Sequence, residues 1–163
     1  MFSVNEINRV TRMNYPQNQI VLWEPSHYKR IQFSDHHNEF LKHFHNYENY
    51  LQAFAESGDS FTALGDGMVY AMFGCFPLWN GVAEAWMLPS RHIQRKTIAL
   101  HRGARLFFDH YAKKKELKRL QFTVHSTNFQ AVRWAKRCYF TEEGRLKNYG
   151  PDGKDHFMFA RYY

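Results

Sequence analysis

The order of segments between residues 60 and 140 constrains the fold more than any other feature of the sequence. Two runs that read as strands, at residues 82–88 and 120–125, flank one helical segment at 97–115. The apolar stripe of that helical segment consists of Leu100, Ala104, Phe107 and Tyr111. Strands that are joined through a single helix and share a sheet run parallel. The sequence therefore predicts a parallel strand pair with a crossover helix inside an α/β fold.

A three-stranded meander is predicted around this crossover. The segments 60–64 and 68–76 are rich in aromatic and apolar residues, and the run Gly65-Asp66-Gly67 between them is a strong hairpin signal. The pair Asn80-Gly81 suits a turn with positive φ and leads into the strand at 82–88. Three antiparallel strands should therefore precede the basic loop at 91–96 and the long helix, whose N-cap we expect to be Thr97.

The remaining segments are expected to complete a single domain of 163 residues. We predict a first strand at 20–23, a helix at 35–57 that begins at Asp35 and ends at Gly58, a short helix at 128–138 and a closing hairpin from 144–149 and 156–162. Residues 1–19 are polar and without a clear period. They are predicted to form an arm or a peripheral turn.

The histidine and cysteine residues are considered as candidates for a metal site and for a disulfide. The predicted helix at 35–57 carries His36, His37, His43 and His45. A zinc site on one helix needs ligands four residues apart, and no pair of these histidines has that spacing. We therefore expect no metal site. Cys75 and Cys138 are far apart in the sequence and are expected to be small buried side chains, because a cytosolic chain rarely holds a disulfide.

One acidic residue interrupts the otherwise apolar strand at 82–88. Strand alternation places Glu84 on one face with Val82 and Trp86, and Ala83 and Ala85 on the other. A buried carboxylate is costly unless it is paired or used in chemistry. Glu84 is therefore either a solvated side chain or a functional carboxylate, and the alternation leaves both interpretations open.

The segment 127–140 carries the best family signature. Its sequence, Thr127-Asn128-Phe-Gln-Ala131-Val-Arg-Trp134-Ala135-Lys-Arg-Cys-Tyr139-Phe140, resembles the Asn-x-x-Ala segment ending in Gly-Phe of the GNAT superfamily of acyl-CoA N-acyltransferases. The run 61–69 looks like that family's second and third strands, and Met158 lies in a similar apolar last strand. The resemblance extends from about residue 61 to the C-terminus. It implies a GNAT fold, a mixed central sheet of six to seven strands with helices on both faces.

The resemblance also implies a reaction and a set of residues. Members of the family transfer acetyl from acetyl-CoA to an amine, with pantetheine between two splayed strands and the pyrophosphate at the N-terminus of the long helix. Glu84 would be the general base, and Tyr139 could act as the acid from a shifted position. The expected CoA contacts are Trp86, Met87, Leu88, Arg91, Arg95, Lys96, Thr97 and Asn128. Asn128 is equally well explained as a helix N-cap.

Two departures from the family pattern support an alternative. The loop 91–96 has no glycine where family members use glycines to bring backbone close to phosphate, so Arg91, Arg95 and Lys96 would have to hold phosphates through side chains. The position of the usual acid, a Tyr, falls on Ala135. The chain also looks like a divergent phage-encoded GNAT-like group, the internal virion protein A-like proteins. The alternative is therefore a catalytically impaired phage protein that acts in virion assembly or as a binding or inhibitor module.

The net charge of +7 favours an anionic partner, namely CoA phosphates, an acidic protein or nucleic acid. No nucleic-acid motif accompanies the charge, so nucleic acid is the weaker candidate. No apolar run approaches the ~20 residues of a membrane span, and no signal-peptide pattern opens the chain. A cytoplasmic location is therefore expected, in the host cytoplasm or virion if a phage encodes the chain. The acceptor amine and a homodimeric state stay open.

Overall fold

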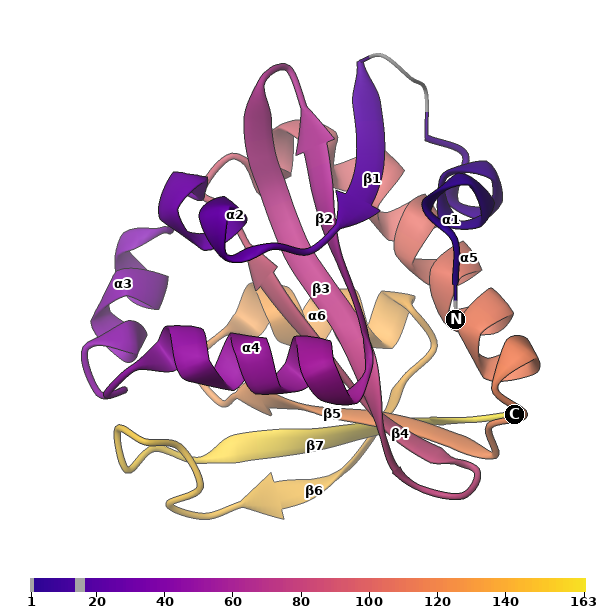
Figure 1. The fold of residues 1–163 in the computed structure, drawn as a ribbon. Coiled ribbons are helices and arrows are strands. Elements are labelled where there is room, and N and C mark those ends of the chain that lie inside the picture. The colour runs from indigo at the N-terminus through magenta and orange to yellow at the C-terminus, as the bar shows by residue number, and fades with distance from the viewer. Residues whose placement is uncertain (1, 14–16) are drawn as a thin grey trace.

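A computed structural model describes residues 2–13 and 17–163. The chain forms one mixed sheet with helices on both faces (Figure 1). The strands are β1 (Asn18–Leu22), β2 (Asp59–Gly65), β3 (Met68–Trp79), β4 (Val82–Pro89), β5 (Arg119–His125), β6 (Thr141–Leu146) and β7 (His156–Tyr162). The helices are α1 (Val4–Thr11), α2 (Pro25–Arg30), α3 (Asp35–Leu41), α4 (Tyr47–Ser57), η1 (Ile93–Lys96), α5 (Thr97–Lys114) and α6 (Phe129–Arg137).

The seven strands lie in the order β1-β2-β3-β4-β5-β7-β6. The pair β4–β5 is parallel, and the other neighbours are antiparallel. The predicted α/β class, the meander and the parallel crossover are therefore confirmed. The closing hairpin is also present, but its first strand begins at Thr141, three residues earlier than predicted.

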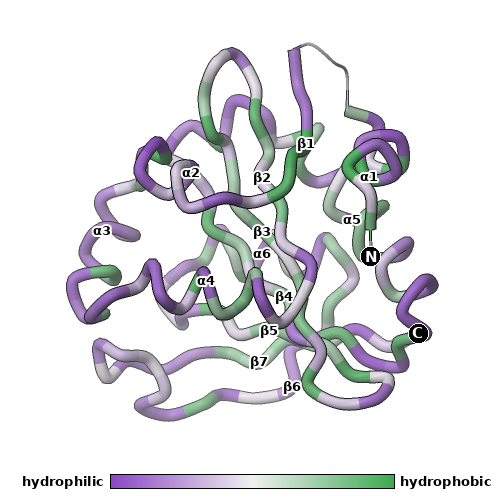
Figure 2. Tube along the Cα trace, viewed as in Figure 1, coloured by the Kyte–Doolittle hydropathy of each residue, from purple (hydrophilic) through white to green (hydrophobic). Residues whose placement is uncertain are grey.

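Two apolar clusters hold the helices to opposite faces of the sheet. The larger cluster joins α1, α5 and α6 to one face, and the smaller cluster joins α2 and α4 to the other. Figure 2 shows the hydrophobic residues along the central strands and the hydrophilic ones on the outer turns of the helices. In the larger cluster the ring of Phe107 on α5 meets Phe73 at 5.2 Å and Phe61 at 5.9 Å between centroids. Truncating such a ring typically costs about 3–5 kcal/mol.

The prediction of an N-terminal arm was wrong for the residues that the structure describes. Residues 4–11 form α1, which starts with a capping box between Ser3 and Glu6. Phe2 and Ile7 are buried against the sheet face that carries α5. Glu6 binds Lys114 at 2.8 Å and His110 at 2.6 Å, so α1 is anchored to α5 by charge and by burial. Residues 1 and 14–16 of the expected arm lie outside the described residues.

The single helix predicted at 35–57 was also wrong, because it is two helices. α3 ends at Leu41 and α4 begins at Tyr47, and Asn46 between them takes a left-handed φ of 58°. A left-handed residue cannot continue an α-helix, and Asn tolerates that conformation better than most residues. Ser34, not Asp35, caps α3 by accepting a hydrogen bond from the His37 N–H. Gly58 ends α4 as predicted.

Candidate functional site

The parallel strands β4 and β5 are paired only at their beginnings in the described part of the chain. The paired positions are Val82 with Arg119, Ala83 with Leu120 and Glu84 with Gln121. Beyond Glu84, β4 continues to Pro89 while β5 continues to His125 beside β7. The two strands therefore separate, and the edge of β4 that faces β5 keeps unpaired backbone groups. This is the splayed pair that the family resemblance implies.

A cavity of about 580 Å³ fills the space between the separated strands, and we call it the fork groove. Its lining includes β4 residues 84–89 and β5 residues 122–125, together with Ala131 and Trp134 of α6, the preceding Asn128, and Phe108 of α5. Further lining residues are His37, Phe40, Phe44, Tyr47, Tyr50 and Phe54 from the α3–α4 region. Tyr149, Gly150, Pro151 and His156 close one side. The fork groove is thus largely aromatic, and elements from both faces of the sheet contribute to its lining.

Glu84 lines the fork groove at the point where the strands separate. Its neighbours Ala83 and Ala85 are buried in the cluster on the α5 side, so Glu84 faces the α4 side with Trp86. Burial raises the pKa of Glu84 above its ordinary value, and a hydrogen bond from Gln121 Nε2 at 3.4 Å partly opposes that rise. A carboxyl with a raised pKa in a cavity is suited to accept a proton near neutral pH.

Several buried ring nitrogens in the fork groove have no hydrogen-bond partner among the described residues. They are Trp86 Nε1, Trp134 Nε1, His37 Nε2 and both ring nitrogens of His156. Burial lowers the pKa of His37 to about 4, so that ring is neutral at pH 7. Buried polar groups without partners are uncommon in folded proteins and indicate water, an ion or a ligand.

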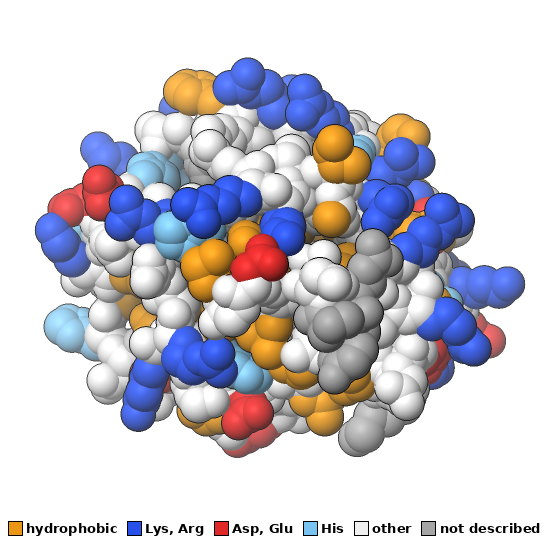
Figure 3. Space-filling model, turned by 90° about the horizontal axis from the view of Figure 1, so that it is seen from above, with side chains coloured by type: hydrophobic (Ala, Val, Ile, Leu, Met, Phe, Trp, Pro, Cys, Tyr) orange, Lys and Arg blue, Asp and Glu red, His pale blue; other side chains and the backbone are white. Residues whose placement is uncertain are grey.

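The loop at 91–96 offers less backbone to an anion than a glycine-rich loop would. Four of its amide groups already donate within the protein: Arg91 to Gln32 O at 2.7 Å, His92 to Ser90 Oγ at 3.1 Å, Ile93 to Ser90 O at 3.1 Å and Arg95 to His92 O at 3.0 Å. The Arg91 and Arg95 side chains are exposed. Figure 3 shows Lys and Arg side chains spread across the end of the molecule seen from above.

The other predicted residues of this region have structural partners. Lys96 is half-buried and pairs with Asp66 at 3.0 Å in the β2–β3 turn. The prediction that Thr97 is the N-cap of α5 was wrong. Lys96 occupies that position, and Thr97 Oγ1 donates a hydrogen bond to Gln94 O at 2.8 Å. The 3₁₀ turn of η1 runs directly into α5, which leaves Thr97 with helical angles.

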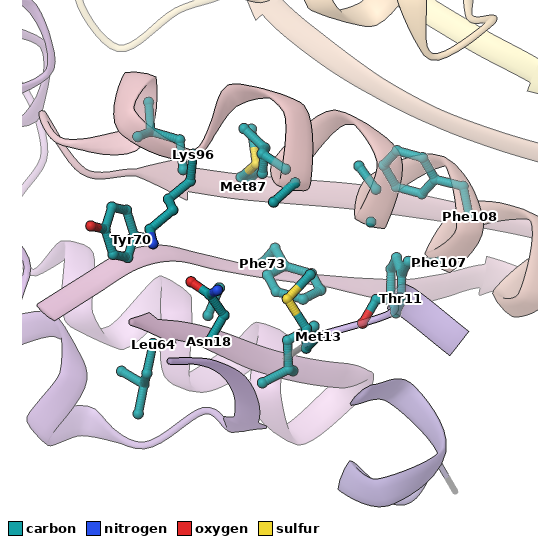
Figure 4. Close-up of a pocket in the computed structure, with 18 of the residues that line it drawn as sticks. Thr11, Met13, Asn18, Leu64, Tyr70, Phe73, Met87, Lys96, Phe107 and Phe108 are labelled. Carbon is teal, nitrogen blue, oxygen red and sulfur yellow. The ribbon is translucent and has the colours of Figure 1, made fainter. Parts of the chain in front are cut away.

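A second cavity, of about 80 Å³, lies between α5 and the β1–β4 part of the sheet. Figure 4 shows Lys96 and Tyr70 at one end of it and Thr11 and Phe107 at the other, with Met13, Phe73 and Met87 between them. Apart from Lys96, Asn18 and Thr11, its lining is almost wholly apolar or aromatic. This small cavity is a packing space between helix and sheet, so we place the functional site in the fork groove.

Asn128 and Tyr139 differ in their relation to the fork groove. Asn128 lines it, and its Oδ1 accepts a hydrogen bond from the Ala131 N–H at 3.1 Å, so the N-cap interpretation is confirmed. Tyr139 follows α6 with a φ of 67° and is 57% exposed. Its ring carries the Arg105 guanidinium 4.3 Å from its centroid, and it does not belong to the groove lining. The structure therefore does not bring Tyr139 together with Glu84.

Sequence reasoning missed three features in and beside the fork groove. The aromatic side chains of α3 and α4 were not singled out as a possible binding surface. Gln121, which contacts Glu84, was read as an ordinary strand residue. His125 and His156 end β5 and begin β7 and pair in register, yet neither was singled out. The position of His125 at the carboxyl end of a parallel strand was an available signal, because ligands collect at such ends.

Comparisons with known proteins support the fold. A probable acetyltransferase superposes with a TM-score of 0.69 at 18% identity, covering 90% of this chain and 93% of that chain. A GNAT-family acetyltransferase from Bacillus anthracis gives 0.69 at 15% identity over 92% and 97%. One from Elizabethkingia anophelis with acetyl-CoA bound gives 0.65 at 14% identity over 91% and 99%. The chain therefore has the GNAT fold. No protein-family model and no curated protein matches the sequence.

No helix within the described ranges is both long enough and apolar enough to cross a bilayer. Cys75 and Cys138 are both free and buried, as expected. Burial raises the pKa of both thiols, so neither is a ready nucleophile. The lining of the fork groove nevertheless offers a carboxyl at Glu84, backbone groups of β4 and several ring nitrogens.

Proposed function

We propose that the protein is an acyl-CoA-dependent N-acetyltransferase that transfers acetyl from acetyl-CoA to an amine bound in the fork groove. The observation that carries the proposal is the separation of β4 from β5 directly after Glu84, with an open cavity along the unpaired edge of β4. The likeness to a GNAT-family acetyltransferase with acetyl-CoA bound supports it. An amine acceptor and a cytoplasmic location are parts of this proposal.

The residues of the fork groove fit the pantetheine part of CoA. The backbone of Trp86, Met87 and Leu88 has one free edge that can pair with the amides of an extended chain. The Trp134 indole N–H is a buried donor without a partner among the described residues. Acetyl-CoA supplies an activated thioester carbonyl when bound. A free N–H of β4 can donate to the carbonyl oxygen as negative charge develops on it.

Glu84 is assigned as the general base. Its carboxylate accepts one proton from the neutral amine as the nitrogen lone pair forms the new N–C bond, and the C–S bond of the thioester then breaks. Tyr139, the residue that the sequence suggested as the acid, does not belong to the groove lining. We therefore assign no side chain to protonate the thiolate. A thiolate is a tolerable leaving group and can take its proton from water. Asn128 keeps its structural role of setting the start of α6 beside the cavity.

The loop at 91–96 fits the phosphates of CoA less well than the fork groove fits pantetheine. This favours binding of the phosphates by side chains and not by backbone amides. Because the amides of Arg91, His92, Ile93 and Arg95 are already engaged, the phosphates would be held by the exposed side chains of Arg91 and Arg95. Exposed charge pairs contribute modestly and weaken in salt. We therefore expect acetyl-CoA to bind, with an affinity that falls as ionic strength rises.

Isothermal titration calorimetry with acetyl-CoA tests the proposal. We expect binding at sub-millimolar ligand and acetylation of primary amines in a panel of peptides and small amines, followed by mass spectrometry. No heat at millimolar acetyl-CoA would contradict the proposal. Binding without acetylation of any amine would favour the second candidate, a catalytically impaired binding protein. The engaged amides of loop 91–96 and the position of Tyr139 are the observations that favour that candidate, and no comparison supports its phage origin.

A further inference from the structure

The turn between β6 and β7 and the carboxyl end of β5 bring three metal-ligating side chains together beside the fork groove. His125 is the last residue of β5, His156 is the first residue of β7, and the two pair directly across the sheet. Asp152 lies in the turn that precedes β7. One ligand atom from each of the three residues lies within 4.8 Å of the others.

His156 supplies the observation that points to a ligand. The residue is 7% exposed, and neither of its ring nitrogens has a hydrogen-bond partner in the described structure. Its ring meets His125 at 5.2 Å and Tyr149 at 5.3 Å between centroids, so aromatic neighbours hold it in place. A buried imidazole held in this way, with a free nitrogen beside another imidazole and a carboxylate, is prepared to coordinate a cation.

Asp152 and His125 already face each other. Asp152 Oδ1 accepts from the Lys154 N–H at 3.1 Å, which orients the carboxylate, and Oδ2 lies 2.9 Å from His125 Nε2. The other ring nitrogen of His125, Nδ1, lies 2.9 Å from Thr127 Oγ1. The carboxylate and the imidazole therefore each have an outer partner, as metal ligands usually do.

We propose that His125, Asp152 and His156 bind a divalent first-row transition ion, with zinc as the best match to two imidazoles and one carboxylate. The ion takes the position now bridged by the His125 Nε2 proton. That proton moves to Nδ1 and is donated to Thr127 Oγ1. The Thr127 backbone N–H, which now donates to Nδ1 at 3.2 Å, would give up that hydrogen bond, and the exposed position of Thr127 lets water replace it. Ion binding requires side-chain rotations that bring the three ligand atoms, now within 4.8 Å of one another, to coordination distance.

The proposed metal site is open toward the fork groove, unlike a structural zinc site, whose coordination positions are all taken by the protein. Both histidines line the fork groove, so coordination positions that the protein leaves free face the cavity. A metal with three protein ligands and an open position binds water or a donor atom of a ligand. The ion would therefore also fix the 149–156 turn, which carries Tyr149 and Pro151 of the groove lining. The inference does not require CoA binding.

The test is a zinc titration of protein without a polyhistidine tag, first treated with a chelator that is then removed. Calorimetry is expected to show one zinc ion bound per chain. The variants His156→Ala and Asp152→Asn are expected to lose this binding, and Thr127→Val to weaken it by about tenfold, which is typical for loss of an outer partner. Asp152→Asn keeps the Oδ1 contact to Lys154, so it serves if His156→Ala fails to fold.

The matched control is His45→Ala, which removes an exposed imidazole from the segment before α4. It should bind zinc as the parent does. Cobalt in place of zinc should give the visible absorption of a four-coordinate site in the parent and in His45→Ala, and lose it in Asp152→Asn. Zinc binding that survives both ligand variants, or that His45→Ala lowers equally, would overturn the proposal. Absence of zinc binding in the parent would overturn it as well.

Discussion

Gln121 donates a hydrogen bond from Nε2 to Oε2 of Glu84 over 3.4 Å, at the last paired position before β4 and β5 separate. The Gln121 Oε1 accepts in turn from Arg119 Nε at 2.7 Å, and Arg119 binds Glu143. A chain of hydrogen bonds therefore links the surface of β6 to the carboxylate in the fork groove. Gln121 orients Glu84 without lining the groove itself.

Glu84→Gln is expected to lower kcat/KM for acetyl transfer by about 10²–10⁴-fold, the usual worth of a general base. Since burial raises the pKa of Glu84, the carboxylate forms only above the ordinary Glu range. Activity of the parent should therefore fall as pH drops through that raised pKa. A pH–rate profile checks this, and the fall should be missing from the residual activity of Glu84→Gln. Equal activity of the parent and Glu84→Gln would show that Glu84 is not the base. The control is Glu56→Gln on α4, which should keep the activity of the parent.

Gln121→Leu is expected to shift the acid limb of the same profile to higher pH. The hydrogen bond from Gln121 stabilises the ionised carboxylate, so its loss raises the pKa of Glu84 further. The rate at high pH should stay near that of the parent, because Glu84 remains present. Gln130→Leu, at an exposed position of α6, should leave the profile unchanged. A uniform loss of rate at all pH values would mean that Gln121 acts only on stability.

Arg91→Gln and Arg95→Gln are each expected to weaken acetyl-CoA binding by about fivefold, which corresponds to about 1 kcal/mol for an exposed charge. The physical reason is that the loop amides are already engaged, so in the proposed complex the side chains would carry the phosphate contacts. Calorimetry at two salt concentrations measures both the affinity and its salt dependence. Lys113→Gln removes one positive charge at the opposite end of α5 and should have little effect. An affinity unchanged in both Arg variants would place the phosphates elsewhere.

The ion pairs of Glu6 predict how α1 responds to acid. The hydrogen bonds from Lys114 and His110 lower the pKa of Glu6 to about 2. A lowered pKa contributes stability that is fully present above the unfolded value near 4.5 and is lost as pH falls toward 2. Glu6→Gln should therefore lower the Tm at pH 7, and this difference should shrink when both proteins are measured near pH 2. Glu116→Gln, at an exposed position, should lower the Tm at neither pH. A difference that is the same at pH 7 and pH 2 would contradict the assignment.

Patterns within single segments were enough to predict most of the sheet. The β2–β3 hairpin follows from Gly65-Asp66-Gly67, because glycine reaches turn conformations that other residues avoid. The crossover through α5 predicts the parallel β4–β5 pair, since handedness and chain length leave few other connections. The helix at 4–11 was missed although the capping box between Ser3 and Glu6 was an available local signal. The break at Asn46 was missed because Asn can stand inside a helix as well as in the left-handed conformation that it takes here.

By itself, the sequence determined which segments are strands, where the chain crosses over and which carboxylate lies at the centre of the sheet. Those properties depend on side-chain period and turn chemistry, which act over a few residues. Only the tertiary structure decided which face Glu84 occupies, that Tyr139 lies outside the groove lining, and that His125, Asp152 and His156 meet. These relationships join residues far apart in the chain, and packing of β4, β5, α6 and the β6–β7 turn sets the distances between them.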